Sequence, residues 1–255
     1  MKLALIQTHL HWENPTANRA MLEEKIANLA QPVDLIVLPE MFTSGFTMNP
    51  AAVAEPMNLT THRWMRQMAA QTGAVLTGSY VVQEKGLFYN RLLWVEPDGT
   101  TDCYDKRHLF RMGGENNHYM SGERRIIKEL NGWRICPLIC YDLRFPVWSR
   151  NVDLAYDVLL YIANWPAARQ STWETLLRAR AIENQCYAIG VNRIGDDANG
   201  MAHAGGSGVI DYLGQPLSAN SDAETIIYVT LQKEPLTSYR ERFPAYLDTD
   251  TFEIS

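Results

Sequence analysis

The chain has 255 residues, 46% of them hydrophobic, and its 23 basic and 29 acidic side chains give a net charge of −6. These charges are dispersed, so the sequence offers no basic surface for nucleic acid or anionic lipid, and no partner of either kind is expected. The chain has no signal-peptide core, no run of about 18 apolar residues and no flexible linker, so we expect one soluble, cytoplasmic domain over residues 1–255.

Short apolar runs along the chain have the length and composition of strands that are buried on both faces. They are residues 3–7, 34–39, 74–82, 134–140, 156–163, 186–192 and 225–231. The run 134–140 contains Pro137, which has no N–H to donate within a central strand. We therefore expect Pro137 at a bulge or at the beginning of its strand.

Amphipathic helices are predicted between some of these strands. Residues 16–30 repeat apolar side chains at i, i+4 and i+7, which places them on one helical face. Residues 171–185 form a second helical pattern, in which Ser171 or Thr172 is the expected N-cap.

Antiparallel hairpins interrupt this alternation of strands and helices. One turns at Asp98-Gly99, a dipeptide typical of tight hairpin turns, and another turns near Gly214. The mixture predicts a layered α/β fold with a mixed sheet. The segment "GGSGV" (205–209) falls in the second hairpin, so we do not interpret it as a phosphate-binding loop.

The four cysteines, Cys103, Cys136, Cys140 and Cys186, show no zinc-ligand spacing. On a strand, Cys136 and Cys140 would lie roughly 13 Å apart, whereas a disulfide needs Cα atoms within about 7 Å. We expect free thiols in a reducing compartment, with Cys103, Cys136 and Cys186 in the core. No histidine pair has a third ligand at metal spacing, so no metal site is predicted.

Three reactive side chains each lie where an apolar strand ends: Glu40, Lys106 and Cys140. Catalytic groups of α/β proteins tend to lie at such positions, and a helix that begins there favours a thiolate or an oxyanion. Taken singly, a buried cysteine, a solvated glutamate and a solvated lysine are ordinary. Taken together, they are expected to converge on one cleft.

The segments around these residues resemble the carbon–nitrogen hydrolase (nitrilase) superfamily. The resemblance rests on "LPEMFTSGF", "YDKRHLF" and "CYDLRFP", and it extends through "ANWP", "RARAIENQ" and "GGSGVI" over nearly the whole chain. Within the superfamily the sequence looks most like the omega-amidase branch. The resemblance implies a four-layer α-β-β-α sandwich with mixed sheets and a homodimer.

The resemblance also implies catalytic roles. Cys140 would attack the amide carbon and form a thioester, with Glu40 as general base and acid. Lys106 and the backbone N–H of Tyr141 would stabilise the oxyanion.

Further site residues follow from the same resemblance. Glu115, seven residues before Gly122, would orient Lys106 or the water, although it could also be a surface charge in a loop. Arg144 would bind the substrate's carboxylate, unless it pairs with Asp142 or another acid. The aromatic side chains expected to line the pocket, or simply to pack, are Phe46 and Trp165.

The resemblance therefore implies an omega-amidase that hydrolyses the terminal amide of 2-oxoglutaramate-like dicarboxylic acid monoamides without a cofactor. The same triad could instead hydrolyse an N-carbamoyl amino acid or a nitrile. A third interpretation is a catalytically silent scaffold with this fold, which the complete Glu40, Lys106 and Cys140 set argues against.

Overall fold

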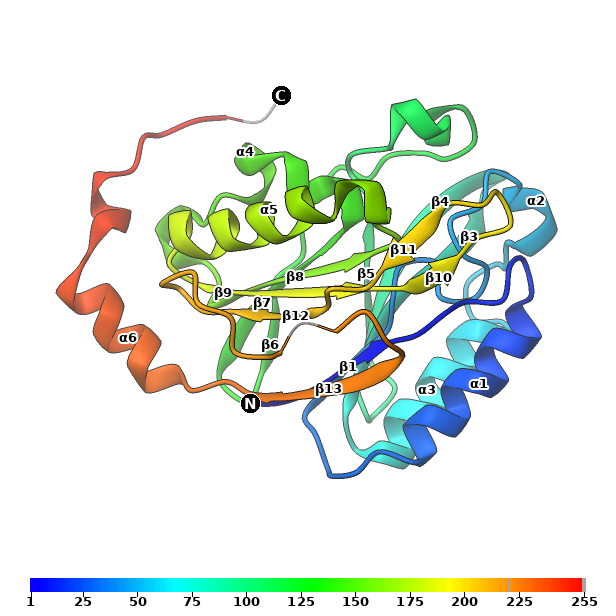
Figure 1. The fold of residues 1–255 in the computed structure, drawn as a ribbon, viewed down its shortest axis with the longest axis horizontal. Coiled ribbons are helices and arrows are strands. Elements are labelled where there is room, and N and C mark those ends of the chain that lie inside the picture. The colour runs from blue at the N-terminus through cyan, green and yellow to red at the C-terminus, as the bar shows by residue number, and fades with distance from the viewer. Residues whose placement is uncertain (220, 254–255) are drawn as a thin grey trace.

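The computed structural model describes residues 1–219 and 221–253, and within them the chain forms two large β-sheets that lie face to face (Figure 1). The first sheet has the strand order β13-β1-β2-β3-β4-β5. Its strands are β1 (Lys2–Gln7), β2 (Leu35–Val37), β3 (Val75–Glu84), β4 (Leu87–Val95), β5 (Thr101–Asp105) and β13 (Thr225–Thr230). The strands β1, β2 and β3 are parallel and the other pairs are antiparallel, so the sheet is mixed.

The second sheet has the strand order β12-β9-β8-β7-β6. Its strands are β6 (Lys128–Leu130), β7 (Trp133–Ile139), β8 (Val158–Ala163), β9 (Tyr187–Asn192) and β12 (Gly208–Ile210). The central strands β7, β8 and β9 are parallel, so their carboxyl ends lie at one edge. Beyond β9, a separate two-stranded ribbon is formed by β10 (Ile194–Asp196) and β11 (Ala202–Ala204).

Helices cover the outer faces of both sheets. Figure 1 shows α1 (Pro15–Ala27) and α3 (Thr60–Thr72) on one side and α5 (Gln170–Glu183) on the other. The remaining α-helices are α2 (Pro50–Val53), α4 (Pro146–Ser149) and α6 (Lys233–Arg242). Short 3-10 helices are η1 (Arg111–Gly113), η2 (Glu115–Asn117), η3 (Cys140–Arg144), η4 (Val152–Leu154), η5 (Ala167–Arg169) and η6 (Ala245–Asp248).

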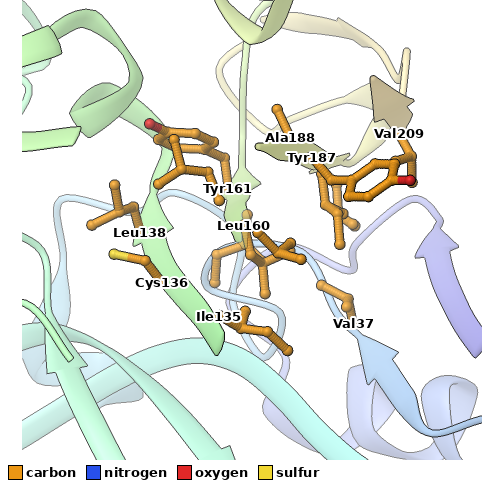
Figure 2. Close-up of a cluster of buried hydrophobic side chains, with 14 of the residues drawn as sticks. Val37, Ile135, Cys136, Leu138, Leu160, Tyr161, Tyr187, Ala188 and Val209 are labelled. Carbon is orange, nitrogen blue, oxygen red and sulfur yellow. The ribbon is translucent and has the colours of Figure 1, made fainter. Parts of the chain in front are cut away.

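The inner strands β1 and β2 of the first sheet are apolar on both faces because each face meets a different layer. In β1, Leu3 and Leu5 join the core between the sheets, whereas Ala4 and Ile6 join the core beneath α1 and α3. Figure 2 shows a buried hydrophobic cluster in which side chains of β7, β8 and β9 gather together with Val37 of β2, so the second sheet packs against the first. The expected four-layer α-β-β-α sandwich is therefore confirmed.

The predicted hairpin turns also occur in the structure, since β4 pairs with β5 around Asp98-Gly99 and a turn at Gly214 leads back to Val209. The predicted N-cap of α5 is wrong. The 3-10 helix η5 runs directly into α5, so this helix begins at Gln170 and its N-cap is Arg169.

Pro137 lies inside β7, so its expected place at a bulge or a strand beginning is also wrong. The carbonyl of Arg134 accepts a hydrogen bond from Asp157, which places residues 134 and 136 toward β8 and Pro137 toward β6. Because β6 pairs only with residues 133–135, the missing N–H of Pro137 removes no hydrogen bond from the sheet.

The four cysteines are free, as expected, and Cys136 and Cys186 are buried in the core, whereas Cys103 is only partly buried. Over the described ranges, no helix combines the length and the apolar composition needed to cross a membrane.

Candidate active site

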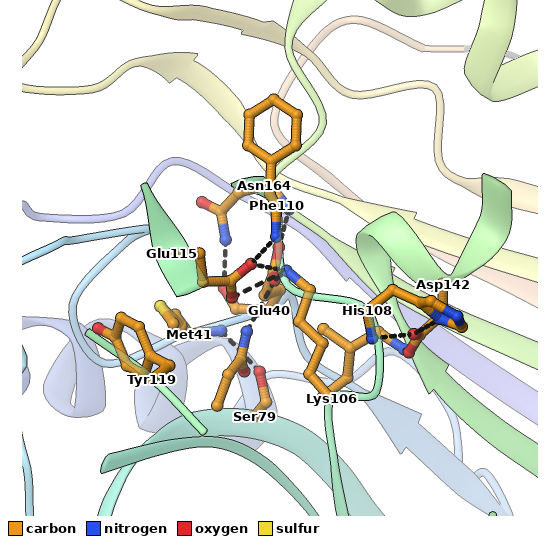
Figure 3. A network of polar contacts seen from close by, with 12 residues as sticks. Glu40, Met41, Ser79, Lys106, His108, Phe110, Glu115, Tyr119, Asp142 and Asn164 are labelled. Carbon is orange, nitrogen blue, oxygen red and sulfur yellow. Dashed lines mark hydrogen bonds and ion pairs between the residues drawn. The ribbon is translucent and has the colours of Figure 1, made fainter. Parts of the chain in front are cut away.

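A buried cluster of two carboxylates and an ammonium lies where strands of the two sheets end (Figure 3). Lys106 Nζ is 2.9 Å from Glu40 Oε1 and 3.0 Å from both carboxylate oxygens of Glu115. All three side chains are 0% exposed. Glu115 is thus not a surface charge, and the alternative interpretation of this residue is wrong.

Cys140 completes the cluster from the end of β7. Its φ of +43° lies in the left-handed region, which strains a residue other than glycine and turns the chain sharply from β7 into η3. Its thiol lies near enough to the Glu40 carboxylate and the Lys106 ammonium for both charges to act on its pKa. The side chains of Glu40, Lys106 and Cys140 therefore meet although they are far apart in the sequence.

Burial raises the pKa of the Cys140 thiol well above its ordinary value, and the Glu40 carboxylate raises it further, while Lys106 opposes both. The free protein therefore holds a protonated thiol. This differs from the expectation that the turn after β7 favours a thiolate, because the five-residue η3 is too short to outweigh burial beside a carboxylate.

The ammonium of Lys106 stays charged. Burial alone would lower its pKa, but the Glu115 and Glu40 carboxylates raise that pKa above its ordinary value. Burial raises the pKa of Glu115, and Lys106 opposes this shift. The arrangement supplies one fixed positive charge between two carboxylates.

The Glu40 carboxylate is fixed by amide groups as well as by Lys106. Asn90 Nδ2 donates to Glu40 Oε1 at 2.8 Å, and the backbone N–H of Asn164 donates to Glu40 Oε2 at 2.8 Å. Asn164 Nδ2 also donates to the backbone carbonyl of Glu40 at 2.6 Å. These donors come from both sheets and hold the carboxylate in one orientation.

Asp142 connects the turn at Cys140 to the loop after Lys106. Its Oδ2 accepts hydrogen bonds from Ile139 N at 3.0 Å and from the Tyr104 hydroxyl at 2.7 Å. Its Oδ1 accepts from the backbone N–H of His108 at 2.9 Å and lies 2.8 Å from His108 Nδ1. Since Asp142 is fully used in this way, the alternative pairing of Arg144 with Asp142 is wrong.

A pocket opens onto this cluster. The four residues expected to contact substrate all line this pocket, namely Phe46, Tyr141, Arg144 and Trp165. Cys140 and Lys106 also lie in its wall. The guanidinium carbon of Arg144 lies 5.1 Å from the centre of the Trp165 ring, and Lys106 Nζ lies 4.9 Å from that of Phe46. Tyr141 packs edge-on against Phe110, which also faces the pocket.

The chain matches the carbon–nitrogen hydrolase family over residues 2–241. It belongs to this family. This carbon–nitrogen hydrolase chain is 49% identical in sequence to Omega-amidase YafV of Yersinia enterocolitica. The alignment covers 99% of this chain and 98% of that protein. It is 30% identical to 2-oxoglutaramate amidase of Bacillus subtilis, with 96% of both chains covered.

Among solved structures, the carbon–nitrogen hydrolase superposes on XC1258 of Xanthomonas campestris with a TM-score of 0.97 and 45% identity, covering 100% of this chain and 99% of that one. That protein is a CN-hydrolase superfamily member with an arsenic adduct in its active site. The family assignment makes the chain a hydrolase of carbon–nitrogen bonds other than peptide bonds.

Several residues of this carbon–nitrogen hydrolase site were not found from the sequence. Asn90 and Arg169 carry no local signal, since one is a polar residue inside a strand and the other is an arginine before a helix. Asn164 lies in the quoted "ANWP" segment, but its partner Glu40 is 124 positions away. Among the described residues, no group of three or more His, Cys, Asp or Glu side chains could hold a metal ion.

Proposed function

We propose that this carbon–nitrogen hydrolase is an omega-amidase that hydrolyses the terminal amide of 2-oxoglutaramate-like dicarboxylic acid monoamides to the acid and ammonia. One observation carries the proposal. The buried thiol, carboxylate and ammonium open onto a pocket in which Arg144 has no acidic partner among residues 1–219 and 221–253. The relatives named omega-amidase, which align with nearly the whole chain, support the same substrate class.

In the first half-reaction, Cys140 Sγ bonds to the amide carbon while its proton passes to Glu40. General base assistance suits a thiol whose pKa is raised, because the proton leaves only as the new bond forms. The oxyanion would be stabilised by Lys106 and by the backbone N–H of Tyr141. Glu40 then returns its proton to the nitrogen, the carbon–nitrogen bond breaks, and ammonia leaves a thioester on Cys140.

In the second half-reaction, a water molecule attacks the thioester and gives a proton to Glu40. The carbon–sulfur bond breaks, the proton returns to Cys140, and the acid is released. Glu115 contacts Lys106 through both oxygens, so its proposed role is to orient the ammonium. Glu40 serves both steps without moving, because Asn90 and Asn164 hold its carboxylate.

The far end of the substrate would bind Arg144. A guanidinium recognises a carboxylate through two parallel hydrogen bonds, and stacking on Trp165 limits its orientations. Phe46 and Trp165 would supply apolar contact for the methylene groups between the carboxylate and the amide.

The test is ammonia release from 2-oxoglutaramate by the wild type, Cys140→Ala and Arg144→Gln. We expect no turnover without Cys140. We also expect Arg144→Gln to raise KM for acid-bearing amides and to leave propionamide, which has no carboxylate, unaffected. Carbon dioxide released together with ammonia from N-carbamoyl amino acids, or faster turnover of nitriles, would replace this proposal by the other hydrolase functions. Absence of ammonia from every substrate would support a silent scaffold.

The proposal includes a cytoplasmic homodimer. Four free cysteines suit a reducing compartment. Exposed apolar side chains, Ile182 (47% exposed) on α5 and Leu213 (52% exposed) beside it, supply a face for a second copy. Light scattering should give twice the mass of one chain, and Ile182→Glu should shift that value toward the monomer.

A further inference from the structure

A second guanidinium, that of Arg169, lines the same pocket as Arg144 and Cys140. Its guanidinium carbon lies 5.4 Å from the centre of the Phe110 ring, whereas Arg144 lies against Trp165. The two cations thus rest on different aromatic walls. In the part of the chain that the structure describes, no ion pair joins either arginine to an acidic side chain.

The backbone of Arg169 is held in place. Its carbonyl accepts a hydrogen bond from Trp165 Nε1 at 2.9 Å, and its N–H donates to the Pro166 carbonyl at 2.9 Å. Phe110, on which its guanidinium rests, donates its backbone N–H to Glu115 Oε2 at 2.6 Å. The Arg169 side chain is therefore fixed relative to the catalytic cluster at both of its ends.

A structural role does not account for this arginine. Arg169 is the N-cap residue of α5, where the helix dipole disfavours a positive charge. Its side chain forms no hydrogen bond within the described residues that would offset this cost. The remaining contact is the stacking on Phe110, which an uncharged planar side chain could partly replace.

The charges around the pocket exceed what one carboxylate requires. Lys106 is neutralised by Glu40 and Glu115, so the unpaired positive charges are those of Arg144 and Arg169. The one acidic side chain lining the pocket within the described residues is Asp197. Its Oδ1 accepts hydrogen bonds from the backbone N–H groups of Asn199 and Met201 in its own turn. One guanidinium suffices for a carboxylate, and the second needs another acceptor.

We propose that Arg169 recognises the substituent on the carbon next to the substrate's carboxylate and favours an oxygen acceptor there. This inference rests on the proposed function, in which Arg144 binds the carboxylate itself. A 2-oxo group offers lone pairs to the guanidinium, a methylene offers none, and an ammonium brings a like charge with donors only. Arg169 thereby selects 2-oxo acid amides over unsubstituted acid amides and over amino acid amides such as glutamine.

The experiment compares kcat/KM for 2-oxoglutaramate, glutaramate and glutamine in the wild type, Arg169→Gln and Arg144→Gln. Loss of a hydrogen bond to a charged group should lower the value for 2-oxoglutaramate by about ten- to a hundredfold in Arg169→Gln. The value for glutaramate should change by less than about threefold, because glutaramate lacks the acceptor. Arg144→Gln is the matched control and should lower both acids by similar factors, since both carry the carboxylate.

Two outcomes would overturn the inference. Equal losses for 2-oxoglutaramate and glutaramate in Arg169→Gln would make Arg169 a second carboxylate ligand, and unchanged values for both would remove it from the substrate site. Thermal unfolding of Arg169→Gln should occur at or slightly above the wild-type temperature, because a positive charge leaves a helix N-terminus.

A binding measurement separates this inference from the proposed function. Calorimetry with Cys140→Ala, alone and combined with Arg169→Gln, gives the affinities of 2-oxoglutaramate and glutaramate without turnover. A wild type that hydrolyses neither amide would refute the proposed function, while selective loss of 2-oxoglutaramate affinity would still support the assignment of Arg169. Equal affinities for both amides in Cys140→Ala would refute that assignment alone.

Discussion

Replacing Lys106 by methionine removes the single positive charge that the structure places between Glu40 and Glu115, while the side chain keeps nearly the same length. The ammonium is within 3.0 Å of both carboxylates and is 0% exposed, so water cannot substitute for it. Loss of one oxyanion donor costs about 3–4 kcal/mol of barrier, which corresponds to on the order of 10²–10³-fold in kcat. Steady-state ammonia release measures this loss.

The same substitution should destabilise the fold in a pH-dependent way. Removing one partner of a buried ion pair costs about 3–5 kcal/mol. Lys106 now opposes the rise in the pKa of Glu115 that burial causes, so that pKa should rise further in Lys106→Met. A carboxyl whose pKa is raised by folding binds its proton more tightly in the folded state than in the unfolded state. The folded variant therefore loses stability as the pH rises from about 4.3, the ordinary pKa of a glutamate, through the raised pKa of Glu115.

Urea unfolding of Lys106→Met at about pH 5 and about pH 8 tests this sign, since the variant should be closer to wild type at the lower pH. The control is Lys128→Met, which removes a partly exposed ammonium from the surface acids Glu96 and Asp102 and should cost less than about 1 kcal/mol at either pH. Activity within about tenfold of wild type, or a stability loss that is the same at both pH values, would contradict the reasoning.

Three other substitutions follow from the same contacts. Glu40→Gln removes a charge that raises the pKa of Cys140, so the pH midpoint for labelling of Cys140 by iodoacetamide should move down. Amide turnover should be lost in the same variant. An upward move of the midpoint would contradict this reasoning. Asp142→Asn turns an N–H group toward the backbone donors of Ile139 or His108, so the free energy of unfolding should fall by about 1–3 kcal/mol. Its kcat should also fall, with little change in KM. The control Asp102→Asn, at an exposed position, should leave kcat unchanged. Gly122→Ala places a methyl group 2.1 Å from the Asp105 carbonyl oxygen, so calorimetry should show a lower unfolding temperature, and ammonia release should be slower. Wild-type values in both measurements would contradict this close contact.

The layers of the fold were predictable where the apolar residues of a strand themselves indicate that both of its faces are buried. Within the runs 3–7 and 34–39, residues 3–6 and 35–38 are all apolar, because alternate side chains pack against the other sheet and against α1 and α3. The boundaries that depend on neighbouring segments were not predictable. The start of α5 was missed because η5 precedes it without a break, and Pro137 is tolerated because β6 is short.

For the site, the positions of Glu40, Lys106 and Cys140 at strand ends were visible in the sequence, and the structure brings them together. Their catalytic roles stay predictions. The groups that orient them were not visible, because Asn164 reaches Glu40 across 124 positions and Asp142 reaches His108 across 34. The raised pKa of Cys140 was missed for a related reason, since burial and the approach of Glu40 arise only from tertiary packing.

The protonated state of the resting Cys140 has a consequence for how long the enzyme lasts. Peroxide attacks thiolates far faster than thiols, and the burial that raises the pKa of Cys140 also limits access to the sulfur. Cys136, whose pKa burial raises to about 12, is a free, fully buried thiol and is protected from oxidation in the same way. An enzyme built in this way should resist oxidative inactivation between turnovers and should be most vulnerable when the thiol proton passes to Glu40 during turnover.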